Sequence, residues 1–157
     1  DVYRCTSPEE FFAAYDKSHT LCMMAQEAIT FTDYFRCYGI GRNAVRVMRY
    51  DPGRPHHERY VRDAGPIEPK LLARVERDCL ALCRALGYDF NTVEFAVRDG
   101  IPVAIDFTNP CPDADRHSVG EDNFTWVIET SSRFLIDRAL HPQPLELTGT
   151  WPEDGSK

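Results

Sequence analysis

The sequence predicts an α+β fold, an antiparallel sheet with helices packed on one face. Residues 34–50 and 92–110 each contain two apolar-alternating segments around a turn with glycine, which is typical of β-hairpins. Residues 69–86 and 123–139 repeat apolar side chains at every third or fourth position, as amphipathic helices that cover a sheet do. The chain has 157 residues and is 43% hydrophobic, which is enough for a core.

The composition narrows the classes of partner. The net charge is −7 and no basic run is present, so we expect no nucleic acid partner. No stretch reaches the ~18–20 apolar residues of a membrane span and no signal peptide opens the chain, so we expect a cytoplasmic protein with no membrane partner. The cysteines form no Cys-x-x-Cys pair, which favours reduced thiols over the alternative of a disulfide framework. Four of them are predicted to be buried on strands or on a helix: Cys5, Cys22, Cys37 and Cys79.

The first thirty residues are predicted to form two strands around a helix. Residues 1–5 form a short strand. Ser7 is the expected N-cap of the helix, with Pro8 at its first position and Glu10 closing a capping box. The continuous apolar run at residues 21–25 is interpreted as a buried strand. An exposed first strand favours self-association, so a homo-oligomer is one expectation.

The first hairpin consists of strands at residues 34–40 and 44–50, and a polar loop follows it. In this loop His56 and His57 lack the paired cysteines of a zinc site, so a zinc module is the weaker alternative.

Two long helices complete the prediction. The helix at residues 69–86 ends at Gly87, and residues 141–157 form a weakly ordered tail. The first helix is predicted to pack on the sheet through Leu72, Val75, Cys79, Leu82 and Leu86. The second is predicted to bury Phe124, Val127, Ile128, Phe134 and Leu135.

Residues 92–110 contain the candidate site. A two-residue turn in this hairpin would mix polar and apolar side chains on each face. A three-residue loop at residues 98–100, with Gly100 left-handed, pairs Phe95 with Val103. We therefore predict this loop, which places all the large apolar residues on one face: Val93, Phe95, Val97, Ile101, Val103 and Ile105.

The other face of this hairpin holds two carboxylates. Glu94 and Asp106 become diagonal neighbours, and they repel each other unless a cation lies between them. Asn109 adds an amide oxygen just beyond the strand, and such oxygen ligands suit Mg²⁺ that holds a substrate phosphate. The alternative is a hairpin with one solvated face. The stiff polar loop that follows Asn109 favours a functional site.

The residues of this hairpin resemble a known family. An acid on one strand, followed at the end of the next strand by an acid and Asn-Pro, is similar to the metal-binding hairpin of the ATP-grasp superfamily of carboxylate–amine or carboxylate–thiol ligases. The resemblance assigns the metal to Glu94, Asp106 and Asn109. The family frequently has Asp at the first acid. It has one residue between the second acid and Asn where this chain has two, so either Asp106 reaches through a bulge or the pair is offset.

A second part of the resemblance lies in residues 21–33, which look like the adenine strand and hinge of the family. In such hinges the extended backbone offers the adenine edge a donor and an acceptor, and an acid accepts from the ribose hydroxyls. The resemblance therefore assigns adenine to the backbone of Glu27, Ala28 and Ile29 and ribose to Asp33.

Three arginines resemble the cations that these enzymes turn toward phosphates: Arg36, Arg49 and Arg59. Of these, Arg36 and Arg59 are the expected catalytic residues. The chain lacks the family's glycine-rich loop and its lysine, so the resemblance implies the C-terminal part of an ATP-grasp domain at residues 1–140. It implies a Mg-dependent, ATP-binding part of a ligase that forms an acyl-phosphate on a small-molecule carboxylate, for attack by an amine or another nucleophile. The alternative is a non-catalytic nucleotide-binding or structural module.

Overall fold

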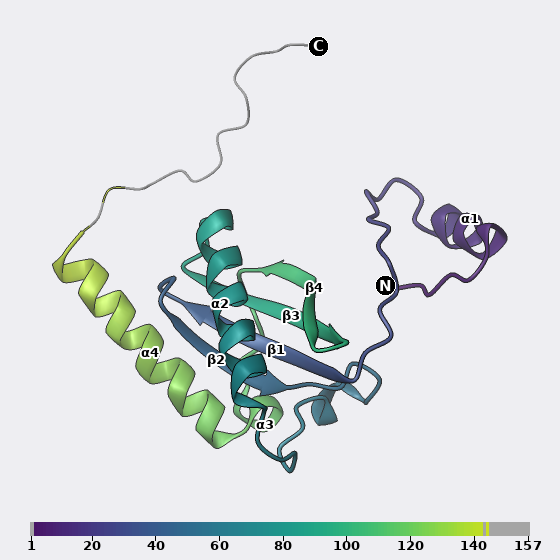
Figure 1. Ribbon diagram of the computed structural model, residues 1–157. Helices are drawn as coiled ribbons and strands as arrows, with labels where there is room; N and C mark the ends of the chain where they lie inside the picture. The colour runs from purple at the N-terminus through teal and green to yellow at the C-terminus, as the bar shows by residue number, and fades with distance from the viewer. Residues whose placement is uncertain (1, 143, 145–157) are drawn as a thin grey trace. The chain divides into compact units, whose positions relative to one another are not determined.

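The computed structural model describes residues 2–142 and 144 (Figure 1). The chain divides into two compact units, one that ends at Thr30 and one that begins at Phe31. The tail predicted after residue 140 lies almost entirely outside the described residues. The elements follow in the order α1 (Pro8–Lys17), β1 (Asp33–Ile40), β2 (Ala44–Arg49), the 3-10 helix η1 (His56–Glu58), α2 (Pro69–Leu86), β3 (Phe90–Arg98), β4 (Ile101–Asn109), α3 (Arg116–Val119) and α4 (Glu121–Leu140). The predicted α+β class is confirmed.

The first unit contains α1, which begins where the sequence predicts. The Ser7 hydroxyl accepts a hydrogen bond from the Glu10 amide at 3.2 Å, as an N-cap does. The Glu10 carboxylate accepts from the Thr6 amide at 2.6 Å, one residue earlier than a capping box requires.

The two strands predicted in this unit are wrong. Residues 2–5 and 21–25 have no strand structure, and the Leu21 side chain is 70% exposed. A strand needs a neighbour for its amide and carbonyl groups, and no strand in the described part of this unit supplies one. Cys5 and Cys22 are accordingly not buried. The argument for self-association through an exposed first strand is lost with that strand.

The second unit is built on a four-stranded antiparallel sheet with the order β2-β1-β3-β4 (Figure 1). β1 and β2 form the first predicted hairpin, in which Ile40 lies opposite Ala44. β1 and β3 pair without interruption, from Asp33 opposite Val97 to Ile40 opposite Phe90. β2 and β4 are the edges of the sheet.

The hairpin of β3 and β4 has a two-residue turn, so the predicted three-residue loop is wrong. Asp99 and Gly100 have φ angles of 53° and 73°, the positive values that a type I′ turn requires at both central residues. Asp tolerates this conformation better than most residues, so the tighter turn can form. Phe95 consequently lies opposite Ala104.

This register changes which side chains of β4 reach the core. Ala104 and Phe107 pack against it, in place of Val103 and Ile105. Ile101 is 49% exposed, so the six apolar residues of the hairpin do not share one face.

The core lies between α2 and one face of the sheet. Its buried members are Phe35, Cys37, Val75, Cys79, Cys83, Val93, Phe95 and Val97. β1 approaches α2 closely at Gly39, where an added Cβ would lie 2.6 Å from Cys83 Sγ. Hydrogen bonding to Cys37, together with burial, raises the pKa of the Cys79 thiol, so Cys79 is a protonated packing group. Leu86, which was predicted to belong to the stripe, is 40% exposed.

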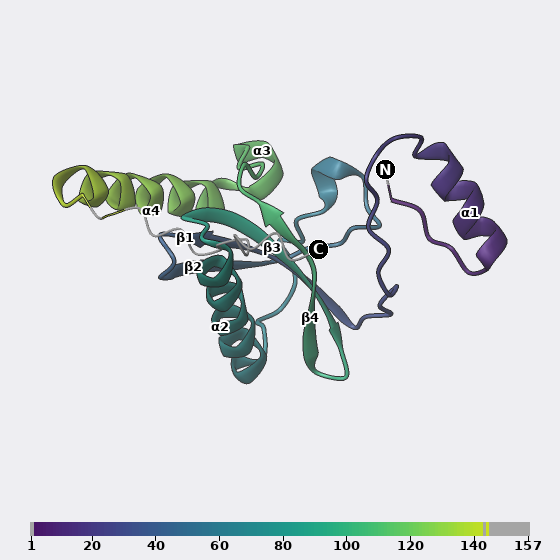
Figure 2. The same cartoon turned by 90° about the horizontal axis from the view of Figure 1, so that it is seen from above.

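The sequence predicts helices on one face of the sheet, but the structure has helices on both faces. Tyr38 and Arg46 are cross-strand partners on the face away from α2. The Tyr38 hydroxyl donates to the carbonyl of Asp113 just before α3, and Arg46 Nε donates to Asn123 Oδ1 in α4 at 2.8 Å. α3 and α4 therefore lie on the side of the sheet opposite α2 (Figure 2). The fully buried Tyr38 gives a physical reason, since this face also needs cover.

α4 buries less of its surface than the sequence predicts. Val127 is buried and Phe124 and Phe134 are half-buried, whereas Ile128 and Leu135 are 51% and 63% exposed. The reason is that α4 contacts the sheet at β1 and β2 and does not cross the other strands. Neither α4 nor another helix within residues 2–142 is long and apolar enough to span a membrane.

Candidate functional site

Glu94 and Asp106 lie directly opposite each other on β3 and β4, on one face as predicted but not as diagonal neighbours. An extra residue in β4 produces this arrangement. Phe95 opposes Ala104, and Glu94, the residue before it in β3, opposes Asp106, so one step along β3 corresponds to two steps along β4. Without this bulge the two-residue turn would pair Asp106 with Val93 and direct its carboxylate toward the core.

A second bulge brings Asn109 to the same face. Asp106 and Asn109 are three residues apart, so a regular strand would direct them to opposite faces. Thr92 lies opposite Asn109 and Glu94 lies opposite Asp106, so β4 contains one residue more than β3 between these pairs. Phe107 lies within this bulge and packs against the core. Of the two alternatives left by the spacing in the sequence, the structure has the bulge.

The Glu94 carboxylate is held by two side chains of β1. Arg36 Nη1 lies 3.3 Å from Oε1, and the Tyr34 hydroxyl donates to Oε2 at 2.6 Å. The Arg36 and Glu94 side chains are 11% and 16% exposed. Burial, followed by the hydrogen bond to Glu94, raises the pKa of Tyr34, so its hydroxyl keeps the proton and remains a donor. A carboxylate has about four acceptor positions, so Glu94 retains capacity for a further ligand.

Arg36 and Arg59 converge on one hydroxyl group. Arg36 Nη1 donates to the Tyr50 hydroxyl at 3.3 Å and Arg59 Nη1 donates to it at 3.5 Å. Arg36 Nε is buried and has no hydrogen-bond partner among the described residues. Two guanidinium groups around one hydroxyl repel each other, and an anion between them removes this repulsion. The cluster therefore has the chemistry of a phosphate or carboxylate site.

Asp33 lies on the other face of the sheet. Its cross-strand partner is Val97, which belongs to the core beneath α2. Its carboxylate accepts from the Arg49 guanidinium. The structure therefore does not bring Asp33 together with Glu94, although both lie on neighbouring strands.

The predicted adenine contacts belong to the first unit. Glu27 and Ala28 are exposed and Ile29 is half-buried, and all three lie in irregular chain. The resemblance assigns the backbone of these three residues to an adenine edge, and this role stays a prediction.

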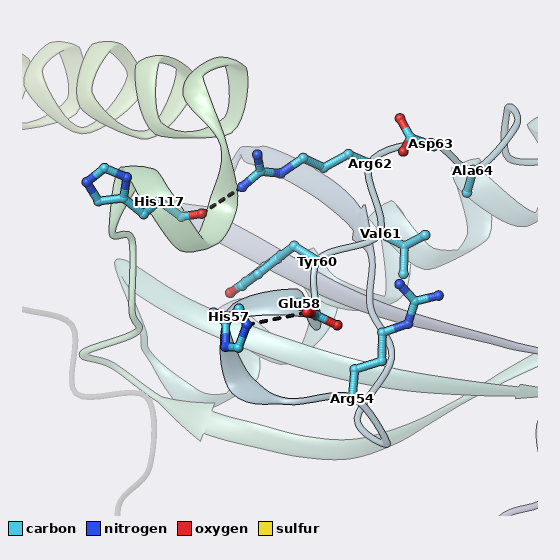
Figure 3. A pocket seen from close by; sticks show the side chains of 9 residues that line it. All are labelled: Arg54, His57, Glu58, Tyr60, Val61, Arg62, Asp63, Ala64 and His117. Carbon is cyan, nitrogen blue, oxygen red and sulfur yellow. Dashed lines mark hydrogen bonds and ion pairs between the residues drawn. The ribbon is translucent and has the colours of Figure 1, made fainter.

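The second unit has an open cavity of about 640 Å³, and Figure 3 draws the residues that line it. It is lined by Arg54, His57, Glu58, Tyr60, Val61, Arg62, Asp63, Ala64 and His117. Arg62 closes one side by donating to the carbonyl of His117 at 2.7 Å. The Tyr60 ring packs edge-on against the Tyr50 ring, with centroids 5.1 Å apart, so one wall adjoins the arginine cluster. The carboxylate pair does not line this cavity.

The ligands on the carboxylate face fit a magnesium ion. Within the described residues no three His, Cys, Asp or Glu side chains gather as a metal site, so the set is limited to Glu94, Asp106 and the amide of Asn109. Mg²⁺ is commonly bound by one or two carboxylates and completes its coordination with water and substrate phosphate. The donors that Tyr34 and Arg36 direct at Glu94 correspond to the outer partners that orient metal ligands.

The sequence prediction missed residues that shape this site. Tyr34 and Tyr50 share a face with Arg36, because every second residue of a strand does, so alternation along the strands could have found them. Asn91 is fully buried and bonds to the bulged part of β4. It gave no signal in the sequence, because the spacing of Asp106 and Asn109 indicates a possible bulge but not which residue of β3 bonds to it.

Two solved structures with a similar fold are of D-alanine–D-alanine ligase from Bacillus anthracis, one of them complexed with ATP. The ATP complex aligns with a TM-score of 0.62 and 16% identity over 83% of this chain and 46% of the ligase. The other aligns with a TM-score of 0.58 and 16% identity over 84% and 50%. The chain thus spans about half the length of the ligases it matches. No family model and no curated protein matches the sequence. The predicted ATP-grasp-like fold is confirmed.

Proposed function

We propose that this chain provides the ATP-binding and metal-binding part of an ATP-dependent ligase that activates a small-molecule carboxylate as its acyl-phosphate. The observation that carries the proposal is the convergence, on one sheet face, of the opposed carboxylates of Glu94 and Asp106 with the paired guanidinium groups of Arg36 and Arg59. The fold that the chain shares with the ATP-bound ligase supports this proposal.

The proposed reaction needs positioning and charge stabilisation from the protein. An oxygen of the substrate carboxylate attacks the γ-phosphorus of ATP, the bond to the β-phosphate oxygen breaks, and ADP leaves. A nucleophile then attacks the acyl carbon and releases phosphate. Glu94, Asp106 and Asn109 would hold Mg²⁺, which would neutralise charge on the phosphates.

Arg36 and Arg59 bind the anionic oxygens in this proposal. Arg36 Nε is the group with unused hydrogen-bonding capacity, and Nη1 is held in place by Glu94 and Tyr50. Arg59 is oriented by donating through Nε to the carbonyl of Arg54 at 3.0 Å. Fixed donors of this kind need no reorganisation as charge develops.

The adenine and ribose contacts remain as the resemblance implies, on Glu27, Ala28, Ile29 and Asp33. The Asp33 carboxylate would have to exchange its bond with Arg49 for the ribose hydroxyls, or accept from both.

Calorimetric titration with ATP, with and without Mg²⁺, tests the binding part of the proposal. We expect Asp106→Asn to weaken ATP binding at least about tenfold when Mg²⁺ is present and to change it little without the metal. Asp99→Asn is the matched control, because Asp99 is an exposed acid of the same hairpin and Asn tolerates its positive φ. Equal ATP affinity with and without Mg²⁺, or equal effects of the two variants, would contradict the proposal.

Hydroxylamine trapping tests the chemistry. An acyl-phosphate reacts with hydroxylamine to give a hydroxamate. Incubation of a ligase that contains this chain together with the glycine-rich loop and lysine of the family, with ATP, Mg²⁺ and a panel of carboxylic acids, should therefore yield a hydroxamate together with ADP. ATP binding without ADP or hydroxamate would instead identify a non-catalytic nucleotide-binding module.

A further inference from the structure

The site depends on an irregularity that the chain must hold in place. Asp106 and Asn109 reach the same face because β4 carries one residue more than β3 between them. A bulge leaves backbone groups without their ladder partners, and buried groups of this kind need other partners. The question is which residue stabilises the extra length of β4.

Asn91 occupies this position. Its side chain is fully buried, and it lies on β3 one residue before Thr92, the partner of Asn109. Nδ2 donates to the carbonyl of Phe107 at 2.9 Å, and Oδ1 accepts from the backbone amide of Asn109 at 2.9 Å. One carboxamide thus provides both the donor and the acceptor that a peptide group of a neighbouring strand would provide.

We propose that Asn91 is a positioning residue that clamps the bulge at residues 107–109 and so directs Asn109 to the metal-binding face. The inference rests on the proposed function, because it assigns Asn91 a role toward the ligands of that same site. Few side chains could replace it. Asp could accept from the Asn109 amide but could not donate to the Phe107 carbonyl when ionised, and Leu has the size but neither polar group.

The extra residue itself provides a sharp test. Deletion of Thr108 leaves one residue between Asp106 and Asn109, so a regular strand would place both on one face with Glu94 and Thr92 as their partners. In such a chain the clamp has no bulge to hold. Replacement of Asn91 should therefore weaken metal binding when Thr108 is present and should have little effect on it when Thr108 is deleted.

Binding of Mn²⁺ alone, followed by electron paramagnetic resonance, measures the site without turnover. We expect Asn91→Leu to weaken Mn²⁺ binding at least about tenfold, the lower end of the effect of removing outer partners at metal sites. We expect deletion of Thr108 in the Asn91→Leu chain to restore affinity to within about threefold of the wild type. The control is Val97→Ala, which shortens a buried side chain on the same face of β3 whose cross-strand partner, Pro102, lies outside both bulges, and it should leave Mn²⁺ affinity unchanged.

Hydrogen exchange at the Asn109 amide gives a second reading that does not involve the metal. Asn91→Leu should accelerate exchange at Asn109 more than at β1 amides, whereas Val97→Ala should not accelerate it selectively at Asn109. If Asn91→Leu fails to fold, Asn91→Gln keeps both polar groups one methylene further out and should show the same selective loss.

The outcomes separate the two proposals. A wild-type chain that does not bind Mn²⁺ contradicts the proposed function, even when exchange shows that Asn91 protects Asn109. A wild-type chain that binds Mn²⁺, together with an Asn91→Leu chain that binds it equally well or is not rescued by the deletion, overturns the role of Asn91 alone.

Discussion

The two strand pairs that involve β3 differ in regularity. β1 and β3 pair residue by residue over the whole length of β1. β3 and β4 lose register twice between Thr92 and Phe95. The carboxylate pair lies where these two patterns meet: the regular ladder sets Arg36 opposite Glu94, and the irregular one sets Asp106 opposite Glu94 from the other side.

This difference shows how one sheet combines a rigid part with an adaptable part. A regular ladder packs one face on α2, and every residue has a fixed side. A bulge breaks this constraint locally and redirects side chains, which is why bulges recur next to active sites. Glu94 belongs to the rigid part and is held by Arg36 and Tyr34, whereas Asp106 and Asn109 owe their direction to the bulges.

The largest loss of stability is expected when the ion pair of Arg36 and Glu94, between β1 and β3, is broken. Arg36→Met keeps most of the side-chain volume but leaves the Glu94 charge largely buried with Tyr34 as its main donor, so we expect the free energy of unfolding to fall by about 3 kcal/mol. Urea denaturation measures this loss. The double variant Arg36→Met/Glu94→Leu should recover much of it, because no uncompensated charge remains. Additive losses in the double variant would show that the pair is not coupled through charge.

The sequence predicts the regular parts of the sheet better than the bulged parts. The regular parts, α2 and the β1–β2 hairpin, were predictable from periodicity. The shared face of Glu94 and Asp106 was predicted from another register, and in the structure it depends on a bulge. The turn at Asp99 and Gly100 was not predictable, because a three-residue loop would by itself place the large apolar residues of the hairpin on one face. In the structure the turn has two residues, and bulges in β4 bring Asp106 and Asn109 to the face of Glu94. Pattern rules assume one residue per position, and a bulge violates this assumption. The strand predicted at residues 21–25 failed for a different reason, since an apolar run alone does not supply a pairing partner.

A smaller loss of stability is expected when the hydrogen bond that Tyr34 donates to Glu94 is removed. Tyr34→Phe removes a hydrogen bond to a charged group, and we expect a loss of about 1.5 kcal/mol at neutral pH. The variant should retain the β1–β3 pairing, so ATP binding should weaken without loss of the fold. Tyr15→Phe, whose ring is 57% exposed, is the control and should leave stability unchanged.

The same variant has a distinctive pH dependence. The pKa of Tyr34 is raised in the folded chain, so above pH 10 the unfolded chain loses this proton while the folded chain keeps it. The unfolded state then binds fewer protons, and stability falls as the pH rises. Tyr34→Phe should make this decline shallower by up to about 1.4 kcal/mol per pH unit in denaturation series between pH 9 and 11. An unchanged slope would mean that the Tyr34 proton is not held more tightly in the folded chain.

The smallest loss of stability is expected at the turn between β3 and β4. Gly100 has a φ of 73° and nothing within 4 Å of an added Cβ, so Gly100→Ala meets backbone strain alone and should cost about 1 kcal/mol. The first bulge lies between this turn and Asp106, and if the bulges fix the register independently of the turn, Mn²⁺ affinity should stay within about twofold of the wild type. Thermal denaturation and Mn²⁺ titration of the same sample measure the two quantities. A loss of metal binding beyond the loss of stability would mean that the turn, and not the bulge between Ala104 and Asp106, determines where the carboxylate of Asp106 points.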